Sequence, residues 1–97
     1  MDITVNELQK RIESGEKLNL IDVREEYEYE ADNIEGLLIP LADLPHRLEE
    51  IEDWRDQEVL VHCRSGKRSE TAQRYMENQG FTNVRNVIGG MLAYREL

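Results

Sequence analysis

The chain has 97 residues, the size of one domain, so we expect a single domain over residues 1–97. Its 21 acidic and 12 basic residues give a formal net charge of −9. This charge argues against nucleic acid and anionic membranes as partners, because phosphate binding needs lysine and arginine. No apolar run approaches the ~20 residues of a membrane-spanning helix, and the start shows no secretory signal pattern. With one cysteine and no internal disulfide, we expect a reduced, cytoplasmic protein, a monomer by default.

The first predicted elements are a helix and a buried strand. Thr4 and Glu7 have the spacing of a helix N-cap and its capping-box partner. Apolar residues at helical spacing follow, and Gly15 marks the end of this helix. The short apolar segment 18–23 (LNLIDV) then predicts a strand that is buried in the protein.

Helices and strands alternate along the rest of the chain. The strongest strand signal is EVLVH, and an amphipathic helix follows it. Because the strands are apolar on both faces and alternate with helices, the predicted fold class is α/β, an open and mostly parallel sheet with helices on both faces. After the first strand we expect a helix over 25–30, a strand over 37–39, a helix over 44–51, a strand over 58–62, a helix over 68–79, a strand over 84–88 and a final helix over 90–97.

The strand over 58–62 leads into the loop CRSGKRS at residues 63–69. In open parallel sheets, binding sites form at the carboxyl ends of strands. The only cysteine lies at the tip of this strand, and Gly66 allows a tight turn with N–H groups pointing inward. The N-terminus of the next helix adds partial positive charge. The loop also contains no acid and three cations, Arg64, Lys67 and Arg68.

These features favour the thiolate form of Cys63. Nearby positive charge and N–H donors lower the pKa of a cysteine, and the thiolate is the nucleophilic form. The same loop would hold an anionic substrate. A lone cysteine that packs as a small apolar side chain is the alternative, but the glycine and the three cations before a helix weigh against it. The sequence therefore predicts a nucleophilic Cys63 in an anion-binding loop.

With this loop, the chain resembles the family of rhodanese-type sulfurtransferases. The resemblance covers nearly the whole chain and implies a rhodanese-like, mostly parallel five-stranded sheet between helices. Departures from the family pattern lie outside the loop: Asp32-Asn33 in place of Gly-His, Leu37 in place of alanine and Tyr94 in place of tryptophan. The matching segments are CRSGKRS at 63–69, LIDVRE at 20–25, Glu28-Tyr29, Ile34-Glu35-Gly36, Ile39-Pro40, residues 58–63 and VIGGM at 87–91.

The resemblance implies an enzyme of the thiosulfate sulfurtransferase (rhodanese) type. Cys63 would take the outer sulfur of a small anionic donor such as thiosulfate and hold it as a persulfide. It would then pass that sulfur to cyanide, a thiol or a protein acceptor. Backbone N–H groups of residues 64–69 would stabilise the charge on sulfur. This reaction implies no metal and no organic cofactor.

Within the loop, we expect Arg64 and Lys67 to recruit the anionic donor. Lys67 is equally compatible with an ordinary solvated lysine. Ser65 and Gly66 are expected to contribute their backbone N–H groups to the active-site loop.

The end of the loop is expected to be structural. Arg68 begins the helix and would pair with a carboxylate such as Asp22, which fixes the loop; substrate binding is the alternative role. Ser69 is expected at the helix N-cap or in its first turn. Asp22 and Arg24 are expected to support the scaffold.

Three other functions share part of this sequence pattern. Cysteine phosphatases place Cys and Arg in a similar loop, with five residues between them. Only four residues separate Cys63 from Arg68. This smaller loop suits a sulfur atom better than a phosphoryl group. A non-catalytic rhodanese-like binding module would be expected to lack the cysteine or the loop charges. A dedicated persulfide carrier for a partner protein is a further alternative. The acidic stretch 25–35 is then either a docking face for a basic partner or a solvated surface.

The histidines are not expected to form a site. His62 precedes Cys63 in a strand, so its side chain should point to the opposite face of the sheet, which excludes a Cys–His dyad. His46 has no cysteine or acidic partner at ligand spacing, so no metal site is expected. Gly89 and Gly90 are expected to turn the chain into the last helix.

Overall fold

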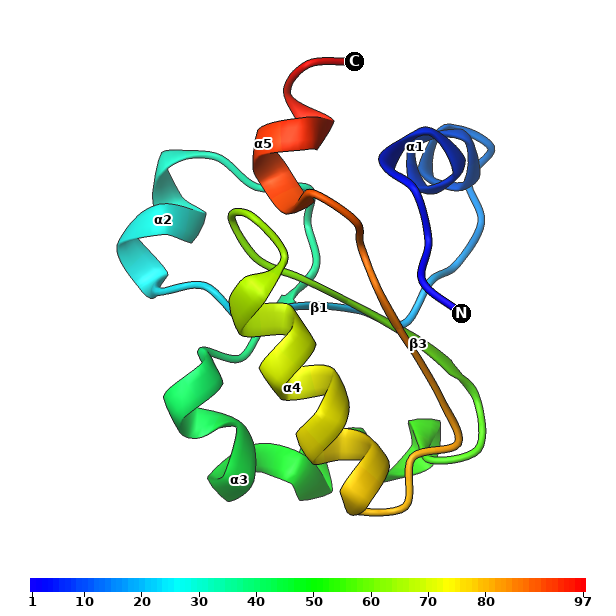
Figure 1. The fold of residues 1–97 in the computed structure, drawn as a ribbon, viewed down its shortest axis with the longest axis vertical. Coiled ribbons are helices and arrows are strands. Elements are labelled where there is room, and N and C mark those ends of the chain that lie inside the picture. The colour runs from blue at the N-terminus through cyan, green and yellow to red at the C-terminus, as the bar shows by residue number, and fades with distance from the viewer.

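One parallel β-sheet forms the centre of the computed structural model, which describes residues 1–97 (Figure 1). Its strands are β1 (Leu20–Asp22), β2 (Leu37–Leu38), β3 (Glu58–His62) and β4 (Asn83–Asn86). They lie in the order β2-β1-β3-β4, and each neighbouring pair is parallel. Ile21 of β1 lies beside Leu37 on one side and Val61 on the other. The predicted α/β class with a parallel sheet is therefore confirmed.

The helices connect the strands, as the predicted alternation requires. They are α1 (Val5–Glu13), α2 (Glu26–Ala31), the 3-10 helix η1 (Leu41–Asp43), α3 (Leu44–Arg47), the 3-10 helix η2 (Leu48–Trp54), α4 (Lys67–Asn78) and α5 (Gly90–Tyr94). The helix predicted over 44–51 is broken into short segments, and Ile51 has a non-helical φ of −119°. The bend allows both Leu44 and Ile51 to be buried in the core.

The sheet has four strands rather than the five that were expected. At the outer edge of β4, the N-terminal segment makes a single parallel bridge between Ile3 and Val87. The N–H of Ile3 donates to the carbonyl of Asn86 at 3.0 Å. The segment does not extend further because Thr4 already caps α1, its hydroxyl accepting a first-turn N–H at 3.2 Å. The pairing of this segment with β4 is therefore limited to the bridge at Ile3.

Two apolar clusters pack on opposite faces of the sheet. Successive strand residues alternate between these faces, so Val61 points toward α3 and α4 whereas Leu60 points toward α1 and α5. The first cluster contains Ile21, Val23, Ile39, Leu44, Ile51, Val59, Val61, Cys63, Ala72, Met76, Phe81 and Val84. The second contains Ile3, Val5, Leu8, Leu20, Leu60 and Val87, with Ala93 and Tyr94 of α5 packed against it.

The parallel arrangement gathers three loops at one edge of the sheet. The segments that follow β1, β3 and β4 all leave from the carboxyl ends of their strands. In Figure 1 the loop between β3 and α4 lies between α2 and α5. None of the helices combines the length and the apolar character needed to cross a bilayer.

Candidate functional site

Cys63 lies at the end of β3, with its side chain buried under the loop that leads into α4. Its Sγ accepts a hydrogen bond from the N–H of Gly66 at 3.1 Å and another from the N–H of Ser69 at 3.4 Å. Gly66 has a φ of 105°, in the left-handed region that residues with a Cβ rarely adopt. The loop and the helix N-terminus thus direct two donors at one sulfur, an arrangement that stabilises an anion there.

The pKa of the Cys63 thiol lies below its ordinary value. Burial alone raises this pKa, but hydrogen bonds from the Ser69 hydroxyl and from the N–H groups of Ser69, Gly66 and Ser65 lower it by more. These bonds favour the charged form of the sulfur, because an anion accepts hydrogen bonds more strongly than a thiol. The surroundings of Cys63 therefore favour the nucleophilic thiolate.

The N-terminus of α5 supports the Cys63 loop from behind. The N–H of Met91 donates to the carbonyl of Cys63 at 2.9 Å, and that of Leu92 donates to the carbonyl of Arg64 at 3.0 Å. A Cβ on Gly90 would lie 2.7 Å from the Arg64 oxygen and closer still to the Cys63 oxygen. Sequence reasoning assigned Gly90 only a turn. The close approach between α5 and the loop is a further reason for glycine at this position.

Ser69 lies in the first turn of α4, which begins at Lys67 after Gly66. It is buried, and its Oγ lies 3.4 Å from Cys63 Sγ. The hydroxyl also donates to Oδ1 of Asn86 at 2.5 Å, and Nδ2 of Asn86 donates to the carbonyl of Gly66 at 3.1 Å. Sequence reasoning missed Asn86, because an asparagine on a separate strand has no spacing that relates it to the loop.

Arg68 pairs with a carboxylate, as expected, but the partner is Glu28 of α2 and not Asp22, the example that the sequence suggested. Its Nη1 and Nη2 donate to the two carboxylate oxygens of Glu28 at 2.7 and 2.9 Å. The Arg68 guanidinium lowers the pKa of Glu28 to about 2. Asp22 is out of reach because its side chain lies on the face of the sheet away from α4, where Arg24 donates to it at 2.8 Å. The loop is therefore tied to α2 rather than to the sheet.

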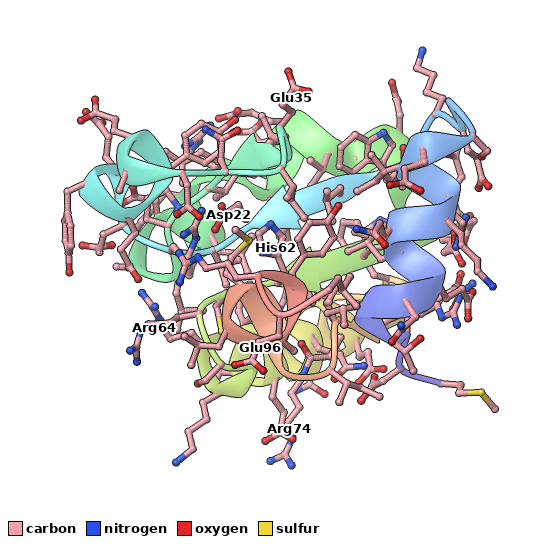
Figure 2. All side chains as sticks on the ribbon, turned by 90° about the horizontal axis from the view of Figure 1, so that it is seen from above. Asp22, Glu35, His62, Arg64, Arg74 and Glu96 are labelled. Atoms are coloured by element: carbon pink, nitrogen blue, oxygen red, sulfur yellow. The ribbon has the colours of Figure 1, made fainter.

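Asp22 and Arg24 form a buried ion pair under the sheet. Arg24 also donates to the carbonyl of Asp32 at 2.8 Å, so it connects β1 to the end of α2. His62 lies beside Asp22 (Figure 2), its Nε2 3.6 Å from Oδ2, and neither ring nitrogen has a hydrogen-bond partner. Its side chain points away from that of Cys63, its neighbour in the chain. No three His, Cys, Asp or Glu side chains gather where they could hold a metal ion.

Arg64, Ser65 and Lys67 are exposed on the outer side of the loop. Arg64 reaches outward from the protein (Figure 2) and is the one arginine with no carboxylate within 4.0 Å. It lines a pocket of about 330 Å³ that carries three arginines and two carboxylates. The pocket is lined by Arg24, Tyr27, Glu28, Ala31, Asp32, Arg64 and Arg95. The predicted site residues thus separate into a group at the sulfur, cations facing solvent and a buried scaffold.

Comparison with known proteins identifies relatives of this chain. It is 41% identical over 91 residues to "Putative sulfur carrier protein YrkF" of Bacillus subtilis (strain 168), an alignment that covers 93% of this chain and 48% of that protein. The chain therefore spans about half the length of that relative. It is 39% identical over 94 residues to "Putative sulfurtransferase YtwF" of the same organism, covering 96% of this chain and 88% of that protein.

A solved structure has the same fold. The crystal structure of SSP1007 from Staphylococcus saprophyticus superposes with a TM-score of 0.84 at 33% sequence identity, covering 96% of this chain and 91% of that one. The names of the sequence relatives support sulfur transfer as the general activity of this group. The family described as Rhodanese-like domain matches residues 4–97. Fold, loop and relatives agree with that match, and this chain belongs to the Rhodanese-like domain family.

Proposed function

We propose that this protein is a sulfurtransferase that carries sulfane sulfur on Cys63 and uses thiosulfate or a similar small anion as donor. The observation that carries the proposal is the convergence of the Gly66 and Ser69 N–H groups on Sγ at 3.1 and 3.4 Å. These donors favour a thiolate before the reaction, and they suit an anionic sulfur adduct after it. The relatives named as a sulfurtransferase and a sulfur carrier protein support the same general activity.

The proposed reaction has two displacement steps. First, the Cys63 thiolate attacks the outer sulfur of thiosulfate; a bond forms between Sγ and that sulfur, the S–S bond of thiosulfate breaks, and sulfite leaves with the electron pair. Second, cyanide or a thiolate acceptor attacks the outer sulfur, and the Cys63 thiolate leaves. The protein gains and loses no electrons over the cycle, so the chemistry balances without a redox cofactor.

Unpaired positive charge beside the loop supports an anionic donor. Arg64 has no internal carboxylate partner, and Lys67 has no ion pair either. In a protein of net charge −9, these cations would draw an anion to this one edge.

Intact-protein mass spectrometry after incubation with thiosulfate tests the proposal. We expect the wild-type protein to gain the mass of one sulfur atom and to lose it on treatment with cyanide. The Cys63→Ala variant serves as the control and should gain nothing, because the chain has no other cysteine. If the folded wild-type protein with a free thiol gains no sulfur, thiosulfate is not its donor. A dedicated protein donor, or a binding module without catalysis, would then be favoured.

A further inference from the structure

Hydrogen bonds lead from the sulfur of Cys63 to the amide of Asn86. Oγ of Ser69 lies 3.4 Å from Sγ and 2.5 Å from Oδ1 of Asn86. The orientation of this amide follows from its other contact, since the group 3.1 Å from the Gly66 carbonyl must be the NH₂, which donates. Oδ1 therefore faces Ser69. An amide oxygen only accepts, so the hydroxyl of Ser69 is the donor in this bond.

A serine hydroxyl has a single proton, and two atoms compete for it here. While Ser69 donates to Asn86, its Oγ offers only a lone pair to Cys63, which suits a neutral thiol that donates its own S–H. A thiolate has no proton and can only accept. Formation of the thiolate therefore favours rotation of the hydroxyl from Oδ1 toward Sγ, at the expense of the bond to Asn86.

Asn86 is held firmly enough to act as a fixed acceptor. It is buried at the end of β4, with 7% of its surface exposed. Its main-chain N–H donates to a carboxylate oxygen of Asp2 at 3.0 Å, and its carbonyl accepts from the N–H of Ile3 at 3.0 Å. Its side chain is hydrogen-bonded to Gly66 and Ser69, so both the main chain and the side chain of Asn86 are held in place.

We propose that Asn86 is a positioning residue for the hydroxyl of Ser69. In the resting protein this hydroxyl donates its hydrogen bond to Asn86, and when the thiolate forms it turns to donate to the sulfur of Cys63 instead. Asn86 does not contact the sulfur itself, and it influences the protonation of Cys63 through Ser69. In this role Asn86 stabilises the thiol and so limits how readily Cys63 ionises, while its amide NH₂ keeps the loop closed over the sulfur. The proposal rests on the proposed function only in taking Cys63 as the reactive group.

A double-mutant cycle tests this competition. Cys63 is titrated by the ultraviolet absorbance of its thiolate in the wild type, Asn86→Leu, Ser69→Ala and the double variant, with Cys63→Ser giving the tyrosine background. Leucine is close to asparagine in size and removes the competing acceptor, so Asn86→Leu should lower the pKa of Cys63 more when Ser69 is present than when it is alanine. We expect the two shifts to differ by about half to one pH unit, roughly three- to ten-fold in the ratio of thiolate to thiol.

Comparing the two shifts cancels any effect of Asn86→Leu on the pKa of Cys63 that does not depend on the Ser69 hydroxyl. The cations that face the loop, Arg64, Lys67 and Arg68, are unchanged in all four proteins, and loosening of the loop contributes in both backgrounds. If Asn86→Leu does not fold, Asn86→Asp replaces it in the cycle. A carboxylate is a stronger acceptor, so its upward shift of the Cys63 pKa should be larger with Ser69 present than with alanine.

Equal shifts in the two backgrounds, or a difference of the opposite sign, would overturn the role of Asn86. The titration requires no sulfur donor. Its failure would therefore leave the persulfide experiment untouched, and a failure to form the persulfide would not change the titration.

Discussion

Each cation near the loop is available to a substrate only to the extent that the protein leaves it unpaired. Arg68 is engaged by Glu28, and Arg95 donates to Asp32 at 2.7 Å. Arg64 has no such partner and is exposed. A guanidinium that makes no internal ion pair can bind an external anion without first breaking a bond to a carboxylate. We therefore propose that Arg64, rather than Arg68 or Arg95, recruits the anionic donor.

Replacement of Arg64 by alanine should weaken the use of thiosulfate. We expect the KM for thiosulfate to rise about five-fold, the effect of about 1 kcal/mol, because the contact is charged but exposed to solvent. The matched control is Arg74→Ala, which removes the same charge from the exposed side of α4, where Arg74 lies 3.7 Å from Glu70. Steady-state kinetics of thiocyanate formation measure both. Equal rises in KM would assign the effect to net charge rather than to Arg64.

At the scale of elements, the loop is fixed between α5 behind it and α2 beside it. The contact with α5 is tested by Gly90→Ala, with Gly15→Ala as its control. Both glycines have positive φ, 54° and 79°, so each substitution should cost about 1–2 kcal/mol in backbone strain. Only at Gly90 would the new Cβ also meet the carbonyls of the loop, since nothing lies within 4 Å of it at Gly15.

We therefore expect Gly90→Ala to lower the free energy of unfolding by about 1–3 kcal/mol more than Gly15→Ala does. It should also slow the formation of the persulfide, because the carbonyls of Cys63 and Arg64 would have to move. Urea unfolding and timed mass spectrometry measure the two effects. Equal losses of stability in the two variants would show that the approach of α5 to the loop is not close.

The contact with α2 depends on the ion pair of Arg68 and Glu28. Its side chains are 35% and 15% exposed, so we expect a coupling of only about 0.5–1 kcal/mol in a double-mutant cycle of Arg68→Met and Glu28→Gln. Both single variants should transfer sulfur more slowly, because the start of α4 loses its tie to α2. Urea unfolding of the four proteins measures the coupling, and a value near zero would mean that the pair does not hold the loop in solution.

The sequence was sufficient to predict the order and type of most elements. β3 and α4 have strong apolar patterns, and Gly66 between them signals a turn, so the loop that contains Cys63 could be located from local information. The single helix over 44–51 was not predicted correctly, and the fifth strand that the family resemblance implied is not confirmed. Their outcome depends on tertiary packing, which bends the helix to bury Ile51 and leaves Ile3 with a single bridge.

Within the site, the position of Cys63 was predictable from the sequence, but the contacts around it were not. Cys63 is the only thiol and lies at a strand end. The partner of Arg68 depends on which face of the sheet α4 covers, and the sequence alone does not determine that Glu28 rather than Asp22 lies within reach. Asn86 meets the loop only because β4 pairs beside β3. Contacts between elements far apart in the chain require the folded structure.

At the scale of the whole molecule, the buried group of Asp22, Arg24 and His62 makes the stability of the fold depend on pH. Burial lowers the pKa of His62, and the nearby carboxylate of Asp22 raises it by less. The ring is thus neutral in the folded protein, whereas in the unfolded chain it takes up a proton near its ordinary pKa of about 6.5. Since the unfolded state binds more protons, stability is fully present above this pH and declines as the pH falls below it.

Replacement of His62 by leucine should reduce this decline. We expect the free energy of unfolding of the wild type to fall between about pH 7 and pH 5, with a slope of at most about 1.4 kcal/mol per pH unit from this group. His62→Leu should show a smaller decline over the same range, because the apolar side chain takes up no proton; what decline remains near pH 5 comes from paired carboxylates such as Glu28, whose pKa is lowered by Arg68. His46→Gln is the matched control, since His46 is exposed on α3 and its loss should leave the slope in place. Urea unfolding at a series of pH values measures all three proteins. A slope that persists unchanged in His62→Leu would mean that other groups cause the acid sensitivity, and that the unpartnered imidazole is tolerated in its charged form.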